Sequence, residues 1–285
     1  MAILAVVLIG RLMGVQVGFV MATSHKRLAK KPLFYYLRRG LALTLAHWRT
    51  HGWNATKARI KYQLWPPKSH REAQRLIGLR DHTAIFSHYY HGNSWGNIES
   101  SSGGGSTLAS TEKIRRHLPL IFEQFNIKRV VDAPCGDFYW MRLVPFGDDM
   151  SYVGLDVVPE LIAKNREAYA SDLRQFVVRN ITRDSFPPGD ILICRDCLPH
   201  FSYEDIYLAL RNFAASDVKF LLTTTFAGLQ ENYDIDTGQF RALDLTAEPF
   251  CLPKDVLYQF DDYAEPHPHH TMALWSRAQV AAALH

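Results

Sequence analysis

Two acidic side chains each end an apolar run of the sequence, and their spacing suits the binding of a small ligand. Asp132 follows the run that begins at Arg129, and Asp156 ends the next run 24 positions later. If these runs are neighbouring parallel strands, their ends form the floor of a ligand site, and Asp156 can accept hydrogen bonds from both hydroxyls of a ribose. Asp132 and Asp137 add negative charge there, and Gly136 lets the backbone approach a ligand closely. That charge favours a cationic ligand over a phosphate.

A second polar group follows the apolar run Ile191–Cys194 and contains residues that can act on a substrate. It includes Asp196 and His200. Histidine is the side chain most easily poised to take a proton near neutral pH, which an attacking hydroxyl has to lose. We therefore predict that Asp196 and His200 contact the substrate nucleophile. The alternative is that His200 only orders its loop.

Alternating strands and helices are expected to position these residues. Thr111 can cap a helix that runs to about Phe125, with apolar residues on one face. Downstream, apolar runs alternate with helical patterns, which indicates a parallel sheet covered on both faces, hence a doubly wound α/β domain. The expected strands are Arg129–Ala133, Tyr152–Asp156, Gln175–Val178, Ile191–Cys194 and Phe220–Thr225, and the expected helices are Glu160–Tyr169 and Tyr203–Phe213.

Together these motifs resemble the class I, Rossmann-like methyltransferases that use S-adenosylmethionine, from roughly Thr111 to the C-terminus. Asp132–Asp137 resembles the first motif of that family, Asp156 its ribose-binding acid, Asn180–Thr182 the turn that meets adenine, and Asp190–His200 its fourth motif. The Asp-x-Pro-Cys-Gly-Asp form is similar to a variant in bacterial methyltransferases of largely unassigned substrate, which also look alike in Arg195–His200 and Asp236–Gly238. The resemblance implies S-adenosylmethionine as cofactor and an antiparallel last strand around Met272–Trp275. The cofactor-binding residues that it implies are Asp132, Ala133, Pro134, Cys135, Gly136, Asp137, Asp156, Asn180, Ile181 and Arg195.

The methyl acceptor is predicted partly from what the sequence lacks. The segment after Ile191–Cys194 has no Asn-Pro-Pro-Tyr type of motif, which the amide and adenine N-methyltransferases of this class use. We therefore predict an oxygen nucleophile on a small molecule or glycan. Arg241 is expected to hold an acidic group of the substrate, or else to form a salt bridge with Asp234 or Asp244. The predicted substrate-binding residues are Trp95, Trp140, Asn232, Thr237 and Arg241.

Two alternatives belong to other functional classes. The first motif of the family usually has three glycines, and Pro134 and Phe138 stand at two of those positions. This leaves open a catalytically inactive binding or regulatory module on the same fold. A nucleotide-dependent oxidoreductase is disfavoured because no Gly-x-Gly-x-x-Gly follows the first strand.

The cysteines and a histidine cluster are expected to be structural rather than metal-binding. Cys194 and Cys197 have Cys-x-x-Cys spacing, but the sequence has no second such pair. His267, His269 and His270 are predicted to lie in a surface loop, so no metal site is predicted. Four cysteines in 285 residues favour a reducing compartment.

The N-terminal part of the chain differs in charge from the rest. Residues 1–75 carry 14 basic and one acidic side chain, whereas residues 76–285 carry 18 basic and 27 acidic ones. We predict a basic, mainly helical extension over residues 1–85, a Gly/Ser-rich loop over 86–110 and the methyltransferase-like domain over 111–285. The extension either contacts an anionic surface or packs back on the acidic domain. Nucleic acid is not favoured as a partner, because no interleaved aromatic platform accompanies the basic residues.

The first residues of the chain leave its location open between two alternatives. Residues 1–21 are apolar but are interrupted by Arg11 and Gln16, and no basic run precedes them. We predict a cytoplasmic protein, with membrane association through residues 1–21 as the alternative. A further alternative is that Met21 is the true start. The sequence indicates neither the oligomeric state nor the identity of the acceptor.

Overall fold

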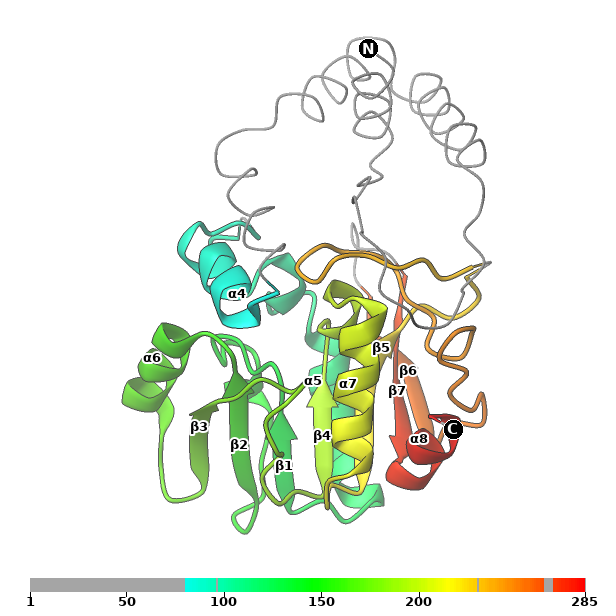
Figure 1. Cartoon of the computed structure of the whole chain (residues 1–285). Coiled ribbons are helices and arrows are strands. Elements are labelled where there is room, and N and C mark those ends of the chain that lie inside the picture. Colours follow the sequence, from blue (N-terminus) through cyan, green and yellow to red (C-terminus); the bar gives the residue numbers. More distant parts are fainter. Residues whose placement is uncertain (1–79, 96, 230, 264–268, 285) are drawn as a thin grey trace, which may run out of the picture. The chain divides into compact units, whose positions relative to one another are not determined.

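A computed structural model describes residues 80–284 except 96, 230 and 264–268 (Figure 1). These residues belong to one compact unit, Arg75–His285. The predictions for the basic extension and for the apolar segment 1–21 therefore lie outside the described residues, apart from the end of the extension. So does the prediction for His267.

The core of this unit is a seven-stranded sheet with the order β3-β2-β1-β4-β5-β7-β6. The first five strands pair in parallel, and β7 pairs antiparallel with both β5 and β6. This confirms the predicted doubly wound, mostly parallel sheet with an antiparallel last strand, and adds β6, which the sequence analysis did not predict. The strands are β1 Arg129–Asp132, β2 Ser151–Asp156, β3 Arg174–Val178, β4 Ile191–Cys194, β5 Phe220–Thr225, β6 Tyr258–Asp261 and β7 Thr271–Ser276.

Helices cover both faces of the sheet, with α7 on one face and α5 on the other (Figure 1). Along β4, Ile191 and Ile193 pack in one apolar cluster with residues of α5, while Leu192 packs in a second cluster with residues of α7 and α8. This alternation explains why the strand reads as a continuous apolar run. The helices are α4 His82–His91, α5 Glu112–Gln124, α6 Pro159–Tyr169, α7 Tyr203–Ala214 and α8 Arg277–Ala283, with short 3₁₀ turns at Gly104–Ser106, Met141–Leu143 and Leu198–His200.

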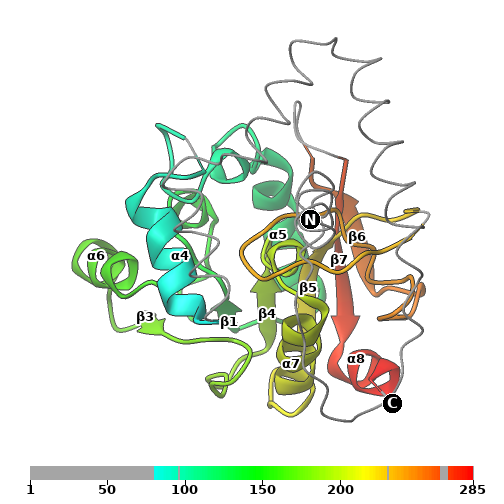
Figure 2. The same cartoon turned by 45° about the horizontal axis from the view of Figure 1, so that its top comes forward.

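Helix α4 and the chain that follows it belong to the sheet domain. Figure 2 shows α4 beyond the carboxyl ends of the parallel strands. The side chain of Asp81 caps this helix by accepting a hydrogen bond from the backbone N–H of Ala84. The boundary predicted between residues 85 and 86 falls inside this helix, which spans His82–His91. The predicted Gly/Ser-rich loop contains the rest of α4 and the turn Gly104–Ser106.

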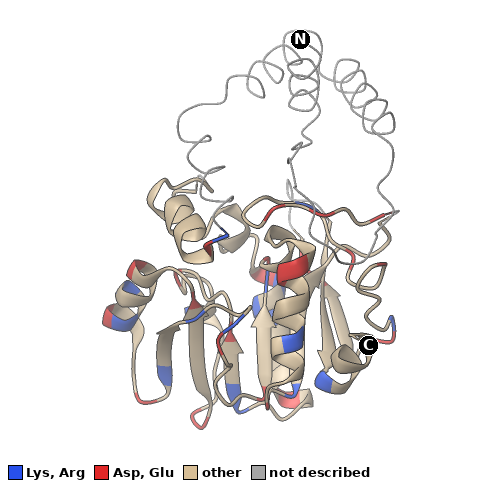
Figure 3. Ribbon diagram, in the orientation of Figure 1, with Lys and Arg blue, Asp and Glu red and all other residues tan. Residues whose placement is uncertain are grey.

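Charges of both signs are spread over the described unit (Figure 3), with Glu204 and Asp205 in the first turn of α7. Acidic residues in that position interact favourably with the helix dipole. No helix among the described residues has both the length and the apolar character needed to cross a bilayer.

Candidate active site

A cavity of about 380 Å³ lies where the parallel strands end. Its wall is formed by residues that directly follow β1, β2, β3, β4 and β5, together with residues of α4 and of the segment before α5. Ligands of open α/β sheets bind at this edge, and small-molecule sites have volumes of about 300–1,000 Å³. Eight of the ten predicted cofactor residues line the cavity, namely Pro134, Cys135, Gly136, Asp137, Asp156, Asn180, Ile181 and Arg195.

Asp156 lies on the cavity wall at the end of β2, as the sequence analysis expected. Its carboxylate accepts hydrogen bonds from the backbone N–H groups of Gly136 (3.2 Å) and Val158 (3.0 Å). Burial raises the pKa of Asp156 to about 6, although these N–H groups oppose the rise. The two bonds fix the carboxylate beside the turn after β1, where it can accept hydrogen bonds from a ligand.

Asp132 and Ala133 do not line the cavity, which differs from the prediction. Asp132 is 2% exposed and accepts a hydrogen bond from the hydroxyl of Tyr152 at 2.7 Å. Burial raises the pKa of Asp132 to about 7. This acid therefore belongs to the interior beneath the site, because a strand's last side chain can point into the helical layer as well as toward a ligand.

Gly136 and Asp137 contact the segment Ser100–Ser106, which we call the serine-glycine loop. Gly136 has φ +53°, and a Cβ atom there would lie 2.3 Å from the Oγ of Ser102. The glycine thus makes room for a serine of the loop, whereas the sequence analysis expected it to make room for a ligand. The Asp137 carboxylate accepts hydrogen bonds from the Ser101 backbone N–H (2.8 Å) and from the Oγ atoms of Ser100 (2.9 Å) and Ser101 (3.2 Å). In this structure Asp137 therefore holds a loop that lines the cavity.

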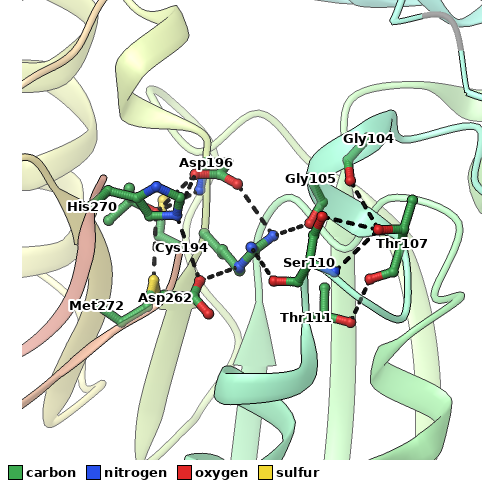
Figure 4. A network of polar contacts seen from close by, with 12 residues as sticks. Gly104, Gly105, Thr107, Ser110, Thr111, Cys194, Asp196, Asp262, His270 and Met272 are labelled. Carbon is green, nitrogen blue, oxygen red and sulfur yellow. Dashed lines mark hydrogen bonds and ion pairs between the residues drawn. The ribbon is translucent and has the colours of Figure 1, made fainter. Parts of the chain in front are cut away.

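Arg195 fastens the other end of the same loop. Its Nη1 donates to the carbonyl oxygen of Gly105 at 2.7 Å. Its Nε donates at 2.6 Å to Oδ2 of Asp262, the residue that follows β6. Nη1 also lies 3.2 Å from Oδ2 of Asp196. Figure 4 labels these three partners, Gly105, Asp196 and Asp262, within the network of polar contacts. Burial would lower the pKa of Arg195, but Asp262 and Asp196 raise it. Arg195 thus joins three segments, and these contacts occupy most of its donors.

Asn180 connects the end of β3 to α4. Its Nδ2 lies 3.2 Å from Nδ1 of His82, whose Nε2 lies 3.0 Å from Asp205 of α7. Its Oδ1 accepts hydrogen bonds from the backbone and hydroxyl of Thr182. The amide is therefore engaged within the protein, and Ile181 beside it offers an apolar surface to the cavity.

His200 and Asp196 line the same cavity as Asp156. Nδ1 of His200 donates to the carbonyl oxygen of Gln239 at 2.9 Å, which leaves Nε2 as the basic atom of the neutral ring. Burial lowers the pKa of His200. Burial would raise the pKa of Asp196, but the positive charge of Arg195 holds it below its ordinary value. Asp196 also has φ +51°, which is uncommon for a residue other than glycine and recurs at functional sites.

The predicted substrate residues separate into two groups. Trp95 and Trp140 line the cavity, whereas Asn232, Thr237 and Arg241 do not. Asn232 is buried and bonds the backbone of Asp244 and Glu248. The Thr237 hydroxyl bonds the carboxylate of Asp205. These two residues hold their own loop in place and do not face a substrate.

Arg241 is 1% exposed, and both predictions made for it were wrong. Its Nη1 donates to the carbonyl oxygens of Pro199 (2.9 Å) and Leu198 (3.3 Å). It neither reaches the cavity nor forms a salt bridge with Asp234 or Asp244 within the described part of the chain. Its contacts instead fix the turn that presents His200.

The sequence analysis missed several residues of the cavity wall, above all His270 and Asp262. His270 is buried and lines the cavity, so the prediction of a surface loop was wrong for this residue, while the side chain of His269 is 61% exposed. A usable signal was present, because the residue before an antiparallel strand lies at the same edge as the residues after parallel ones. Other residues that were missed include Phe86, Tyr90, Arg179, Phe201, Phe226, Phe240 and much of the serine-glycine loop.

All four cysteines are free, and Cys135, Cys194 and Cys197 are buried. Cys194 and Cys197 pack in the core beside Leu198 and Phe201. No cluster of three His, Cys, Asp or Glu side chains suited to a metal ion occurs within the described ranges.

Comparison with known proteins gives weak likenesses only. No protein-family model and no curated protein matches the chain. The magnesium protoporphyrin IX methyltransferase of Synechocystis PCC 6803, solved with bound SAH, is 12% identical, and the match covers 78% of this chain and 98% of that one with a TM-score of 0.44. The N-methyltransferase NodS of Bradyrhizobium japonicum WM9 is 9% identical, with 60% and 98% covered and a TM-score of 0.42. At these identities and TM-scores the likenesses establish no function for this chain.

Proposed function

We propose that the chain is an S-adenosylmethionine-dependent methyltransferase that acts on an oxygen atom of a small molecule or glycan. The observation that supports this most directly is the shared cavity. One cavity is lined both by the Asp156 carboxylate and by the His200 ring, whose Nε2 is basic. A cofactor and an acceptor can therefore meet inside a single cavity.

The wall of the cavity fits a cationic cofactor that carries a ribose. Its described residues include four acids, Asp137, Asp156, Asp196 and Asp262, and two cationic side chains, Arg179 and Arg195. The excess of acids favours a sulfonium over a phosphate. Asp156 is held by backbone N–H groups in a position to accept hydrogen bonds from ribose hydroxyls, and Ile181 and Leu161 offer apolar surface to a base.

Phe138, at one of the two missing glycine positions, is compatible with this cavity, while Pro134, at the other, lines it. Phe138 has φ +57° and is 1% exposed, so a bulky residue occupies the left-handed conformation and packs into the core. Its ring contacts Tyr152, Tyr169 and Phe176. The phenylalanine thus points away from the cavity, and its size does not fill the cofactor end. This supports an active enzyme over an inactive module.

The chain's own residues would supply positioning and one proton transfer. S-adenosylmethionine, when bound, supplies a methyl group on a positively charged sulfur that leaves as a neutral thioether. The protein then has to hold the acceptor oxygen in line with that methyl group, which accounts for much of the catalysis in such displacements. Nε2 of His200 takes the proton of the acceptor hydroxyl, while the Nδ1 bond to Gln239 keeps the ring oriented.

Calorimetric titration of the full-length protein tests this proposal. S-adenosylmethionine and S-adenosylhomocysteine should bind at micromolar concentrations, and NAD should not. Asp156→Asn should weaken binding at least tenfold, whereas Asp172→Asn, at an exposed position outside the cavity, should bind as the unmodified protein does. Absence of binding at millimolar cofactor would refute the proposal. Binding without turnover across a broad panel of acceptors would favour the inactive binding module.

A further inference from the structure

Four aromatic rings form a continuous row in the part of the cavity that contains His200. The ring centroids of His200 and Phe240 are 5.3 Å apart, those of Phe240 and Phe226 are 6.3 Å apart, and those of Phe226 and His270 are 5.2 Å apart. All four residues line the cavity. Such rings offer a wide flat apolar surface, which favours stacking or edge contacts with another aromatic ring.

Phe240 is placed as a ligand-binding residue rather than as a core residue. It lines the cavity yet remains 51% exposed, and Trp95, also on the wall, is 36% exposed. Large apolar side chains at the rim of a cavity mark ligand-binding surfaces more often than they stabilise the free protein. An apolar ligand that covered these rings would remove their surface from water.

The charged groups beside the rings are paired with one another, which bears on the choice between a glycan and an aromatic acceptor. Besides the rings, Phe201 and Trp140 line the wall, and the polar side chains beside them are Asp196, Asp262 and Arg195. Each sugar hydroxyl buried against phenylalanine without a hydrogen-bond partner would be unfavourable. A flat molecule with one or two hydroxyl groups meets this wall with fewer unpaired groups.

The charges around Arg195 disfavour an acidic acceptor. Asp262 and Asp196 both lie within 3.2 Å of the guanidinium group, so two carboxylates face one cation. Nε2 of His270 lies 3.8 Å from Asp262 and 4.0 Å from Asp196. Figure 4 shows these three side chains together. Among the described residues near this end, Arg241 is buried behind the wall and does not line it. A carboxylate or phosphate on the acceptor would therefore approach two acids, and the cation beside them, Arg195, is already paired with both.

We propose that the methyl acceptor is a flat aromatic compound whose nucleophile is a phenolic hydroxyl and which carries no acidic group. This inference rests on the proposed function. The phenolic oxygen forms a bond to the methyl carbon as the bond between that carbon and sulfur breaks, and the phenolic proton passes to Nε2 of His200. The products are an aryl methyl ether and S-adenosylhomocysteine. A phenol has a pKa near 10, as in tyrosine, so an imidazole base removes its proton more readily than that of a sugar hydroxyl.

Binding of three matched probes to the full-length protein saturated with S-adenosylhomocysteine tests the inference without turnover. The probes are 2-naphthol, 6-hydroxy-2-naphthoate and methyl glucoside, each titrated by calorimetry. We expect 2-naphthol to bind at least tenfold more tightly than the other two. Equal or tighter binding of the glucoside, or of the carboxylate, would overturn the inference. Failure of S-adenosylhomocysteine itself to bind would overturn the proposed function as well, so the two failures are distinguishable.

A pair of exposed aromatic residues provides the matched variants. Phe240→Leu should weaken 2-naphthol binding at least fivefold and leave S-adenosylhomocysteine binding unchanged. Tyr233→Leu is the control, because Tyr233 is similarly exposed, at 50%, but does not line the cavity. Both positions are exposed, so neither change should prevent folding. If both variants bind 2-naphthol as the unmodified protein does, the ring row is not the acceptor surface.

Discussion

The attachment of the serine-glycine loop to Asp137 gives the sharpest prediction. Oδ2 of Asp137 accepts the Ser101 backbone N–H at 2.8 Å and the Ser100 Oγ at 2.9 Å, and Oδ1 lies 3.4 Å from the Ser102 Oγ. Asp137→Asn removes the charge and turns one accepting oxygen into a donor. A hydrogen bond to a charged group contributes roughly 1.5–3 kcal/mol, and Asp137 is partly exposed, so we take ~2 kcal/mol for the whole change.

That loss should appear in cofactor binding because the loop lines the cavity. If the attachment of the loop contributes the lost ~2 kcal/mol to binding, the Kd for S-adenosylhomocysteine should rise about 30-fold, at about 1.4 kcal/mol per tenfold. Most of the change should lie in a faster dissociation rate. Amide hydrogen exchange of residues 100–106 should accelerate in the variant, which ties the affinity change to the loop.

A double-mutant cycle separates this role from direct contact between Asp137 and the cofactor. Ser102→Ala removes a partner of Asp137 on the loop without touching the acid. If Asp137 acts through the loop, Ser102→Ala should also weaken binding, and its effect should be smaller in the Asp137→Asn background. Additive effects, or unchanged exchange of residues 100–106 in Asp137→Asn, would refute the loop-anchoring role.

Three further predictions concern Asp132, His200 and Gly136. The pKa of Asp132 is raised from an ordinary value near 3.8 to about 7, so between these pH values the folded state binds a proton that the unfolded state has lost, and stability falls as pH rises. Asp132→Asn should remove this fall, which is at most about 1.4 kcal/mol per pH unit, in urea melts from pH 4 to 8; parallel stability curves for the variant and the unmodified protein would contradict the prediction. His200→Gln should reduce kcat about 10²-fold or more and leave the affinity for S-adenosylhomocysteine unchanged; an unaltered kcat would show that His200 is not the base. In the unmodified enzyme, kcat should fall on the acid side below pH 6.5, because burial lowers the pKa of His200 from its ordinary value of 6.5. Gly136→Ala should destabilise the fold by roughly 1–3 kcal/mol and weaken cofactor binding, because the added Cβ would lie 2.3 Å from the Oγ of Ser102 and residue 136 has φ +53°. Adding Ser102→Gly should restore part of the loss; if it restores none, the backbone strain at residue 136 alone is responsible.

The sequence alone determined the five parallel strands and the residues that end them. Parallel strands buried on both faces have to be continuous apolar runs, so β4 and β5 were predicted with the bounds that the structure shows, Ile191–Cys194 and Phe220–Thr225. The side chains that follow such strands gather at one edge for geometric reasons. This is why Asp156 and His200 were placed in one site before their surroundings were known.

Only the tertiary structure decided what each of these side chains contacts. The partner of Asp137 lies 37 positions away at Ser100, and the partner of Arg195 lies 67 positions away at Asp262. Nothing in the local pattern marks such pairs, since a carboxylate or guanidinium group binds whichever complementary group the fold brings within about 3 Å. Strand β6, with Asp262 after it, buries only Phe260 and so lacks the apolar run that made the equally short β4 predictable. Its pairing with β7 is what brings that acid to the cavity.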